Sequence, residues 1–288
     1  MKVSVIIPVF NEEDVIIECL ESLGKQTYKD FEVIVIDDES TDNTVQNIKK
    51  SFTFYPLPFT LLHKKHLGPG AARNLGAKHA KGEILVFVDA DMTFDPDFID
   101  KLVEPIIKGE TKGTFSKEEY ISNWENIWAR CWNINQNWPD NKRHPNNYPN
   151  EDKVFRAIEK SEFKKVGGFT PGGYTDDYSL SEKLGYKSKV ATGAKFYHKN
   201  PSSLSEVFRQ AMWSGKRPYK LGYFGYLGGL IRVSLPLSLI VGLYKSFSLK
   251  GQALLTFHHL PFILFKVVYD FGIFVGIISY ILTGKGSK

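Results

Sequence analysis

Three runs of β-branched and other apolar residues constrain this chain most strongly. They are Val3 to Phe10, Phe31 to Ile36 and Ile84 to Val88, and stretches with helical patterns accompany them. Strands that alternate with helices predict βαβ units and a parallel sheet. The carboxyl ends of the strands then meet at one edge, which is where open α/β sheets bind ligands.

Three helices are expected to accompany these strands. Asn11 is a good N-cap, and the acidic residues after it suit the first turn of a helix. The expected helices are Asn11 to about Gly24, a second that begins near Ser40 or Asp42, and a third from near Gly70 to the stop at Gly82.

Regularity weakens from Thr111 to Asn150, which we assign to an acceptor-facing segment with a helix around Tyr120 to Ile134. Trp124, Trp128 and Trp132 would share one stripe of that helix, which favours core packing over a sugar platform or a membrane anchor. After Glu151 the expected elements are the strand VFRAIEK, the helices SEFKKVGG and TDDYSLSEKLGYK, and the closing strand KVATGAKFYH.

The C-terminal part differs in composition. Phe224 to Leu243 and Leu260 to Thr283 are apolar and close to the roughly 20 residues that span a bilayer. Arg232 interrupts the first, and Lys266 and Asp270 interrupt the second at a spacing that lets them meet on one helix face. A charge at mid-bilayer costs about 2.5–3.5 kcal/mol. Two spans, two interfacial helices and a buried helical subdomain therefore all stay open, with membrane attachment favoured.

Charge and cysteine content narrow the function classes. The net charge of +5 is modest and the basic residues are scattered, so no nucleic-acid partner is expected. Cys19 and Cys131 lack metal-ligand spacing and are expected to be reduced thiols.

A pair of carboxylates, Asp89 and Asp91, directly follows the third strand. Like charges this close repel each other unless a cation lies beside them. Hard oxygen ligands suit Mg²⁺ or Mn²⁺, which could bridge the phosphates of a nucleotide and stabilise a departing diphosphate. A D-x-D pair alone is also compatible with a solvated turn.

Four segments supply the context for that pair. In chain order they are VSVIIPVFNEE, VIVIDDESTDNT, GPGAARNLGAKHAKGEILVFVDADM and GGYTDDYSLSEKLGYK. Together they resemble the inverting family 2 glycosyltransferases over about residues 1 to 215. The resemblance implies a GT-A fold, which is a Rossmann-like, mostly parallel sheet flanked by helices. We expect residues 1–220 to form the catalytic domain, with a nucleotide-sugar half (1–110) and an acceptor half (111–220), and residues 221–288 to form a membrane-associated helical tail.

The resemblance also implies roles for individual residues. Asp91, Asp89 and His198 would be metal ligands, with Asp91 the strongest candidate. A satisfied surface histidine is an equal reading of His198. Asp177 would be the catalytic base, with Asp176 beside it, although one of these acids could instead cap the helix that follows.

Donor contacts are implied as well. For Asp37 and Asp38, the alternative to a donor contact is helix capping. For Arg73, the alternative is an exposed position on a helix surface. The implied donor-binding residues are Pro8, Phe10, Glu12, Asp37, Asp38, Arg73, Asp89, Arg209 and Lys216.

Arg209 and Lys216 belong to RQAMWSGKR, a segment similar to the family's downstream basic and aromatic stretch. It departs from the Q-x-x-R-W pattern of processive synthases, because Met212 stands before Trp213. Polymer synthesis is therefore not expected.

The implied activity is that of an inverting hexosyltransferase. It would use a UDP- or GDP-linked sugar with Mg²⁺ or Mn²⁺, and its acceptor would be a hydroxyl of a glycan or a lipid-linked glycan. A polyprenyl-phosphate sugar synthase and a non-catalytic nucleotide-sugar binder are the alternatives. Basic residues flank both apolar stretches, which predicts a cell-membrane location with the catalytic domain on the cytoplasmic side.

Overall fold

Residues 1–54, 58–171, 176–248 and 259–286 are described in the computed structural model of this chain. They divide into a first unit, Met1–Tyr120 with Asn146–His198, and a second unit, Ile121–Pro145 with Lys199–Ser287. This division differs from the border expected at residue 220, because part of the assigned acceptor segment groups with the C-terminal helices.

The first unit is built on an eight-stranded sheet with the order β3-β2-β1-β4-β9-β6-β10-β8. β1 pairs in parallel with β2 and β4, β2 with β3, and β6 with β10, whereas β9 and β8 run antiparallel to their neighbours. The strands are β1 (Val3–Val9), β2 (Phe31–Asp37), β3 (Phe59–His63), β4 (Ile84–Phe87), β6 (Gly113–Phe115), β8 (Glu151–Asp152), β9 (Ala157–Glu159) and β10 (Ser188–Val190). The predicted mostly parallel sheet is thus confirmed.

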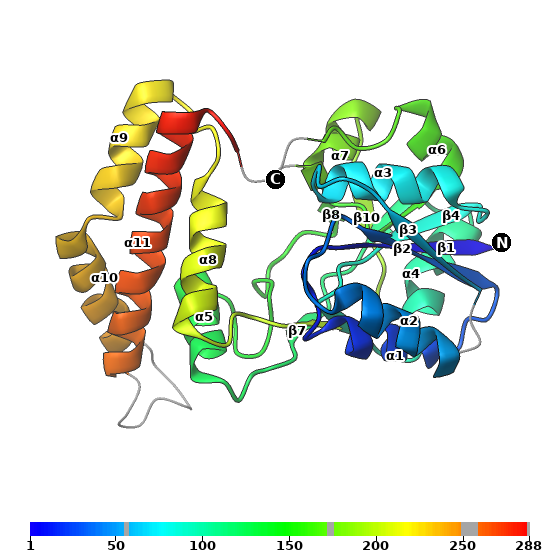
Figure 1. The fold of residues 1–288 in the computed structure, drawn as a ribbon, viewed down its shortest axis with the longest axis horizontal. Coiled ribbons are helices and arrows are strands. Elements are labelled where there is room, and N and C mark those ends of the chain that lie inside the picture. Colours follow the sequence, from blue (N-terminus) through cyan, green and yellow to red (C-terminus); the bar gives the residue numbers. More distant parts are fainter. Residues whose placement is uncertain (55–57, 172–175, 249–258, 287–288) are drawn as a thin grey trace. The chain divides into compact units, whose positions relative to one another are not determined.

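Helices cover both faces of this sheet, as Figure 1 shows. They are α1 (Ile16–Gly24), α2 (Thr44–Phe54), α3 (Pro69–His79), α4 (Phe98–Ile107), α6 (Lys160–Lys165), the 3₁₀ turn η1 (Asp176–Tyr178) and α7 (Ser179–Leu184). Alternate β1 residues enter different cores: Val5 packs with α1 and α4, and Ile6 packs with α3, α6 and α7. This alternation is the period-2 pattern of a strand buried on both faces.

A second, three-stranded sheet lies in the same unit, with the order β5-β11-β7. Its strands are β5 (Met92–Phe94), β11 (Phe196–His198) and β7 (Glu119–Ile121). The predicted single closing strand is therefore wrong, because β10 ends at Val190 and joins the large sheet, and β11 starts a new sheet after a turn.

The first helix also differs from its prediction, since α1 begins at Ile16 and not at Asn11. Asn11 has a left-handed backbone, and its side chain accepts a hydrogen bond from the Thr41 backbone N–H at 2.8 Å. Glu13 accepts from the Asn43 backbone N–H at 2.9 Å. Asn11 and Glu13, which were predicted to start the first helix, thus stabilise the segment that leads into α2. That helix begins at Thr44, close to the predicted position.

The second unit is helical. It contains α5 (Ile127–Gln136), α8 (Leu204–Gly215), α9 (Gly222–Arg232), α10 (Leu235–Ser248) and α11 (His259–Thr283). The helix predicted from Tyr120 starts later, at its N-cap Asn126, so Trp124 lies outside the helix and the three-tryptophan stripe is wrong. Trp132 packs edge-on against Phe265 and Tyr269, as core packing predicts.

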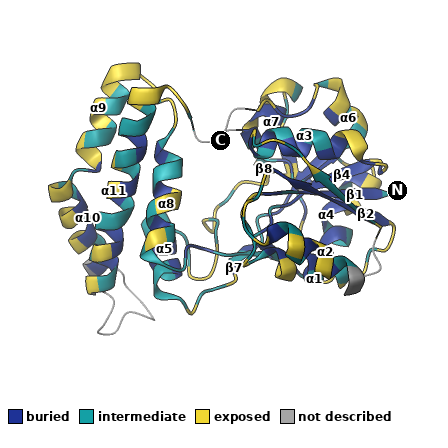
Figure 2. Cartoon of the chain, viewed as in Figure 1, coloured by how far each residue is buried: buried dark blue, intermediate teal, exposed yellow. Residues whose placement is uncertain are grey.

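The first predicted apolar stretch is broken into α9 and α10, which meet at 59°. Pro236 has no N–H to donate to the carbonyl of Arg232, four residues earlier, so one helix cannot continue through this point. The helix over Leu260–Thr283 is long and apolar enough to cross a membrane, with a mean hydropathy of 2.0. Figure 2 shows that α9 is largely exposed, and none of its residues is buried.

Candidate active site

Acidic side chains gather where the central strands of the large sheet end. Asp37 closes β2, Asp38 follows it, and Asp89 lies two residues beyond β4. β2 and β4 both pair in parallel with β1, so these positions share the carboxyl edge of the sheet. The predicted ligand-binding edge therefore carries the predicted acids.

Arg73 on α3 connects two of the predicted acidic positions. Its Nη2 lies 2.7 Å from Asp89 Oδ1, and its Nη1 lies 2.5 Å from Asp177 Oδ1. The guanidinium is buried and packs over the ring of Phe169, at 5.6 Å from the centroid. The alternative of a surface helix position is therefore wrong, since Arg73 is buried and joins segments 104 positions apart in the sequence.

A second arginine, Arg156, contacts the other oxygen of Asp89, with Nη1 3.3 Å from Oδ2. Burial opposes ionisation of Asp89, but the charges of Arg73 and Arg156 outweigh it and hold the pKa of this carboxyl well below its usual range. Asp89 is therefore a fixed anion whose charge two arginines already balance.

Asp91 has different partners. Its Oδ2 lies 2.9 Å from His198 Nε2, and His198 Nδ1 lies 2.7 Å from Glu119 Oε1. His198 is the last residue of β11, so the small sheet brings it to the residue just before β5. The contact with Asp91 is compatible with a metal ligand, and the contacts at both nitrogens are also those of a satisfied histidine, so both readings of His198 stay predictions.

These donor atoms fit a divalent cation. Two atoms that bind adjacent positions of an octahedral ion at about 2.1 Å are about 3.0 Å apart, and Asp91 Oδ2 and His198 Nε2 are 2.9 Å apart. Among the described residues, no group of three or more His, Cys, Asp or Glu side chains could hold a metal ion. Two protein ligands completed by phosphate oxygens and water are a common arrangement for Mg²⁺, and the imidazole also suits Mn²⁺.

Glu12 lies in the field of the same acids. Burial, together with the negative charges of Asp91 and Asp89, raises the pKa of Glu12 to about 8. This edge of the sheet thus concentrates more negative charge than the nearby arginines neutralise, which favours the binding of a cation.

Asp176 and Asp177 are adjacent but differ in environment. Asp176 is buried, and its Oδ2 accepts a hydrogen bond from the Gly70 backbone N–H at 3.1 Å, at the start of α3. Asp177 is about half exposed, with 47% of its side chain accessible. One acid thus caps a helix, as the alternative reading expected, but the helix is α3 and not the one that follows. Residues 172–175 of this motif lie outside the described residues.

Asp38 organises the loop that follows β3, and Asp37 organises the loop that follows β2. Asp38 accepts hydrogen bonds from the backbone N–H groups of Leu67 at 3.1 Å and Gly68 at 2.8 Å, and it also pairs with Lys64. Asp37 accepts from the Ser40 backbone N–H at 3.1 Å. Their expected contacts with a nucleotide base stay a prediction.

The remaining donor-binding candidates are spread over both units. Pro8 lies within β1, and Phe10 is exposed just beyond it, with its ring 4.2 Å from that of His66. Arg209 lies on α8 and Lys216 is its C-cap, both in the second unit. Their contacts with a donor stay predictions.

Two site residues were missed by the sequence reading, Glu119 and Arg156. Glu119 begins a strand of three residues, which is too short to show a period, and it was placed in the irregular segment. Arg156 lies inside the VFRAIEK run, where an arginine between apolar residues could have marked a buried ion pair.

The layered α/β sheet with its carboxyl-edge acids defines a GT-A-like protein. The chain belongs to Glycosyl transferase family 2, whose profile matches residues 4–167. The resemblance and the fold class expected from the sequence are confirmed.

Two relatives show how far the similarity extends. TarS of Staphylococcus aureus (strain Mu50), a poly(ribitol-phosphate) beta-N-acetylglucosaminyltransferase, is 44% identical over 103 residues, which are 35% of this chain and 17% of that protein. The poly(ribitol-phosphate) beta-glucosyltransferase of Bacillus spizizenii is 44% identical over 94 residues, which are 32% of this chain and 15% of that protein. The matches therefore span about a sixth of these relatives.

Solved structures share the fold over nearly the whole chain. TarS residues 1–349 in complex with UDP-GlcNAc align with a TM-score of 0.58 at 17% identity, covering 99% of this chain and 93% of that one. The mannosyltransferase PcManGT from Pyrobaculum calidifontis, in complex with GDP-Man and Mn²⁺, aligns with a TM-score of 0.59 at 18% identity, covering 96% and 87%. At 17–18% identity, the structural similarity establishes a shared fold.

Proposed function

We propose that this chain is a metal-assisted, inverting glycosyltransferase that moves a sugar from a nucleoside-diphosphate sugar to a hydroxyl of a glycan or a lipid-linked glycan. The observation that carries the proposal is the double ion pair of Arg73 with Asp89 and Asp177. It unites the strand-end acidic pair with the second acidic pair in one network. TarS is named for poly(ribitol-phosphate) and was solved with UDP-GlcNAc, which supports a UDP-linked donor and a polyol-phosphate acceptor.

Asp91 and His198 would hold the Mg²⁺ or Mn²⁺ of the proposed reaction. When bound, the cation supplies positive charge that stabilises the departing diphosphate. The complex of PcManGT with GDP-Man and Mn²⁺ supports the use of a divalent metal. Asp89 would act through its two arginines, by holding the positive guanidinium groups of Arg73 and Arg156 at the ligand-binding edge.

Asp177 would be the general base. The acceptor oxygen attacks the anomeric carbon, the bond from that carbon to the diphosphate oxygen breaks, and the hydroxyl proton passes to the carboxylate. One such displacement inverts the anomeric configuration. The exposure of Asp177 leaves its carboxylate accessible to an acceptor, and the contact between its Oδ1 and Arg73 fixes its orientation.

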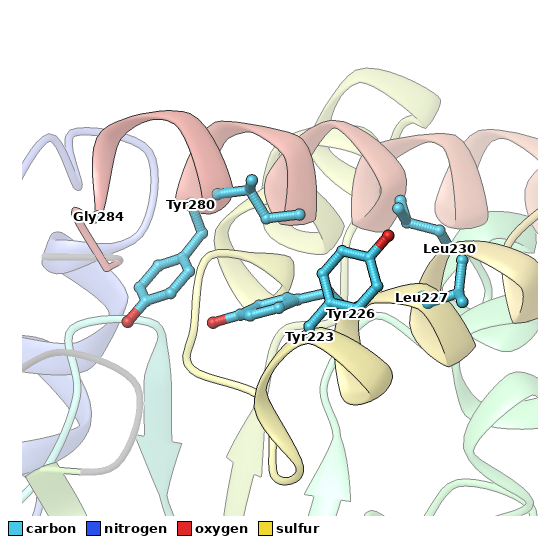
Figure 3. A pocket seen from close by; sticks show the side chains of 7 residues that line it. Tyr223, Tyr226, Leu227, Leu230, Tyr280 and Gly284 are labelled. Atoms are coloured by element: carbon cyan, nitrogen blue, oxygen red, sulfur yellow. The ribbon is translucent and has the colours of Figure 1, made fainter.

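A lipid-phosphate acceptor is the second candidate, and a cavity of about 400 Å³ in the second unit favours it. The cavity lies between α9 and α11, and side chains from both helices face it (Figure 3). It is lined by Tyr223, Tyr226, Leu227, Leu230, Tyr280, Ile281 and Gly284. These rings and aliphatic groups suit an apolar chain. We propose that the second unit attaches the protein to the cell membrane, with the catalytic unit on the cytoplasmic side.

The first test measures nucleotide binding by thermal shift and calorimetry with UDP, GDP, CDP and dTDP, each with and without Mn²⁺. Tighter binding of one nucleotide with Mn²⁺, lost in Asp91→Asn, is expected. No binding of any nucleotide would refute the proposed function, and binding without sugar transfer would identify a non-catalytic binder.

The acceptor class is tested with Asp177→Asn, because a phosphate oxygen is already anionic and needs no base. Transfer to a hydroxyl should be abolished while nucleotide binding is retained. Unchanged transfer to a polyprenyl phosphate would instead favour the second candidate.

A further inference from the structure

We propose that Glu119 is a positioning residue that sets the tautomer and orientation of His198 for binding the divalent cation. This inference rests on the proposed metal-assisted function. It concerns a residue to which neither the sequence motifs nor the family resemblance assigns a role.

The small sheet builds this arrangement from three separate parts of the chain. Asp91 directly precedes β5, His198 ends β11 and Glu119 begins β7. β11 lies between the other two strands and pairs His198 with Met92. The histidine therefore lies between a carboxylate of β7 and one that directly precedes β5.

Each nitrogen of the imidazole ring lies beside a carboxylate oxygen. Nδ1 lies 2.7 Å from Glu119 Oε1, and Nε2 lies 2.9 Å from Asp91 Oδ2. Glu119 is buried, with only 8% of its surface exposed. Glu119 is the more buried of the two carboxylates, with 10% of its side chain exposed against 31% for Asp91. When a cation lies beside Asp91 and His198, Glu119 would accept the Nδ1 proton, and the lone pair of the neutral ring would belong to Nε2.

This arrangement has a chemical consequence for metal binding. A carboxylate that accepts from the far nitrogen of a ligating histidine fixes the ring and raises its basicity, and loss of such a partner typically weakens metal affinity by about 10- to 100-fold. Glu119 would change metal affinity only through His198, whose nitrogen would bind the cation. The effect should therefore be larger for Mn²⁺, which accepts imidazole, than for Mg²⁺, which prefers oxygen.

The decisive experiment compares Glu119→Gln with Glu118→Gln in the full-length protein. Both changes remove one negative charge on neighbouring residues, but Glu118 accepts from the Gly193 backbone N–H and does not contact His198 in the described hydrogen bonds. Mn²⁺ affinity is measured by calorimetry in the presence of UDP. We expect Glu119→Gln to bind Mn²⁺ about 10-fold more weakly, with a smaller change for Mg²⁺, and Glu118→Gln to bind both as wild type does.

A double-mutant cycle separates positioning from a structural role. In a His198→Ala background, Glu119→Gln should have no further effect on Mn²⁺ affinity, because the ligand through which Glu119 acts is gone. Equal and additive losses with and without His198 would overturn the inference, as would equal affinities for the two glutamine variants. Absence of Mn²⁺ binding in the wild-type protein would instead refute the proposed function. Should Glu119→Gln fail to fold, Glu119→Asp provides the same cycle with the charge retained.

Discussion

At the scale of single residues, the site depends on contacts between distant parts of the chain. The acids at positions 89, 91, 176 and 177 could be predicted because they lie in short motifs beside recognisable elements. Arg73 was placed among the donor-binding residues, but its buried ion pairs could not be predicted, because they depend on two acids that the fold brings to it. The same holds for Glu119, whose partner lies 79 residues away.

Replacing Arg73 tests whether this guanidinium supports both the fold and the site. Arg73→Met leaves Asp177 without this partner and Asp89 with Arg156 alone. We expect a loss below the roughly 3 kcal/mol of a fully buried pair, because Asp89 and Asp177 are 30% and 47% exposed. Lys78→Met, at an exposed position on the same helix, is the control. Urea unfolding of the two variants gives the comparison, and equal stability would show that the ion pairs of Arg73 contribute nothing.

Gly70 offers a test of the contact with Asp176. A Cβ at position 70 would overlap the carboxylate oxygen that accepts from the Gly70 backbone N–H. Gly70→Ala should cost about 1–3 kcal/mol through overpacking and should lower sugar transfer, because Asp177 is the next residue. Gly228→Ala is the matched helical control, since open space surrounds that position. Thermal unfolding and transfer rates are measured for both, and a neutral Gly70→Ala would contradict the structure here.

At the scale of elements, the sequence predicted those strands that are long and buried, because they appear as long runs of apolar residues. β1 and β2 each have seven residues that are buried almost throughout, and both were predicted. β5, β7 and β11 have three residues each, too few for a period to show, and their pairing depends on the tertiary fold. The element that carries the metal-binding candidates was therefore the one least visible in the sequence.

The helices of the second unit are joined by a buried polar group. Lys266 Nζ lies 2.6 Å from both oxygens of Asp270 on α11, and Ser238 on α10 donates to Asp270 Oδ2 at 2.7 Å. The sequence spacing predicted the first contact, and the structure adds the serine. The charges that interrupt the apolar stretch thus stabilise the contact between α10 and α11.

A double-mutant cycle tests this polar group. Lys266→Met or Asp270→Leu alone leaves one buried charge unpaired and should cost about 3–5 kcal/mol, whereas the double variant should recover most of that loss. Thermal unfolding in detergent provides the measurement. Single losses that simply add in the double variant would show that the two side chains do not act as a pair.

At the scale of the whole molecule, the chain crosses between its two units more than once. Residues 121–145 leave the first unit, contribute α5 to the second, and the chain then returns. The change in composition predicted a domain border where the apolar tail begins. Composition shows how polar a segment is, but it does not show which elements pack together. The catalytic domain expected over residues 1–220 therefore includes α5 and α8, which pack against α11 of the tail.

A fragment ending at residue 220 should consequently fail to fold cleanly. Cys131, Trp132 and Val207 form one buried cluster with Phe262 and Phe265 of α11, and the fragment removes that helix. A close approach between α8 and α11 would be lost as well, since a Cβ on Gly276 would overlap the Met212 carbonyl. Uncovering these side chains exposes apolar surface, at about 1.5–3 kcal/mol for each large residue. We expect the fragment to aggregate or to bind the dye ANS strongly, in contrast to a control lacking only residues 285–288. A monomeric 1–220 fragment without dye binding would show that α5 and α8 do not need the tail.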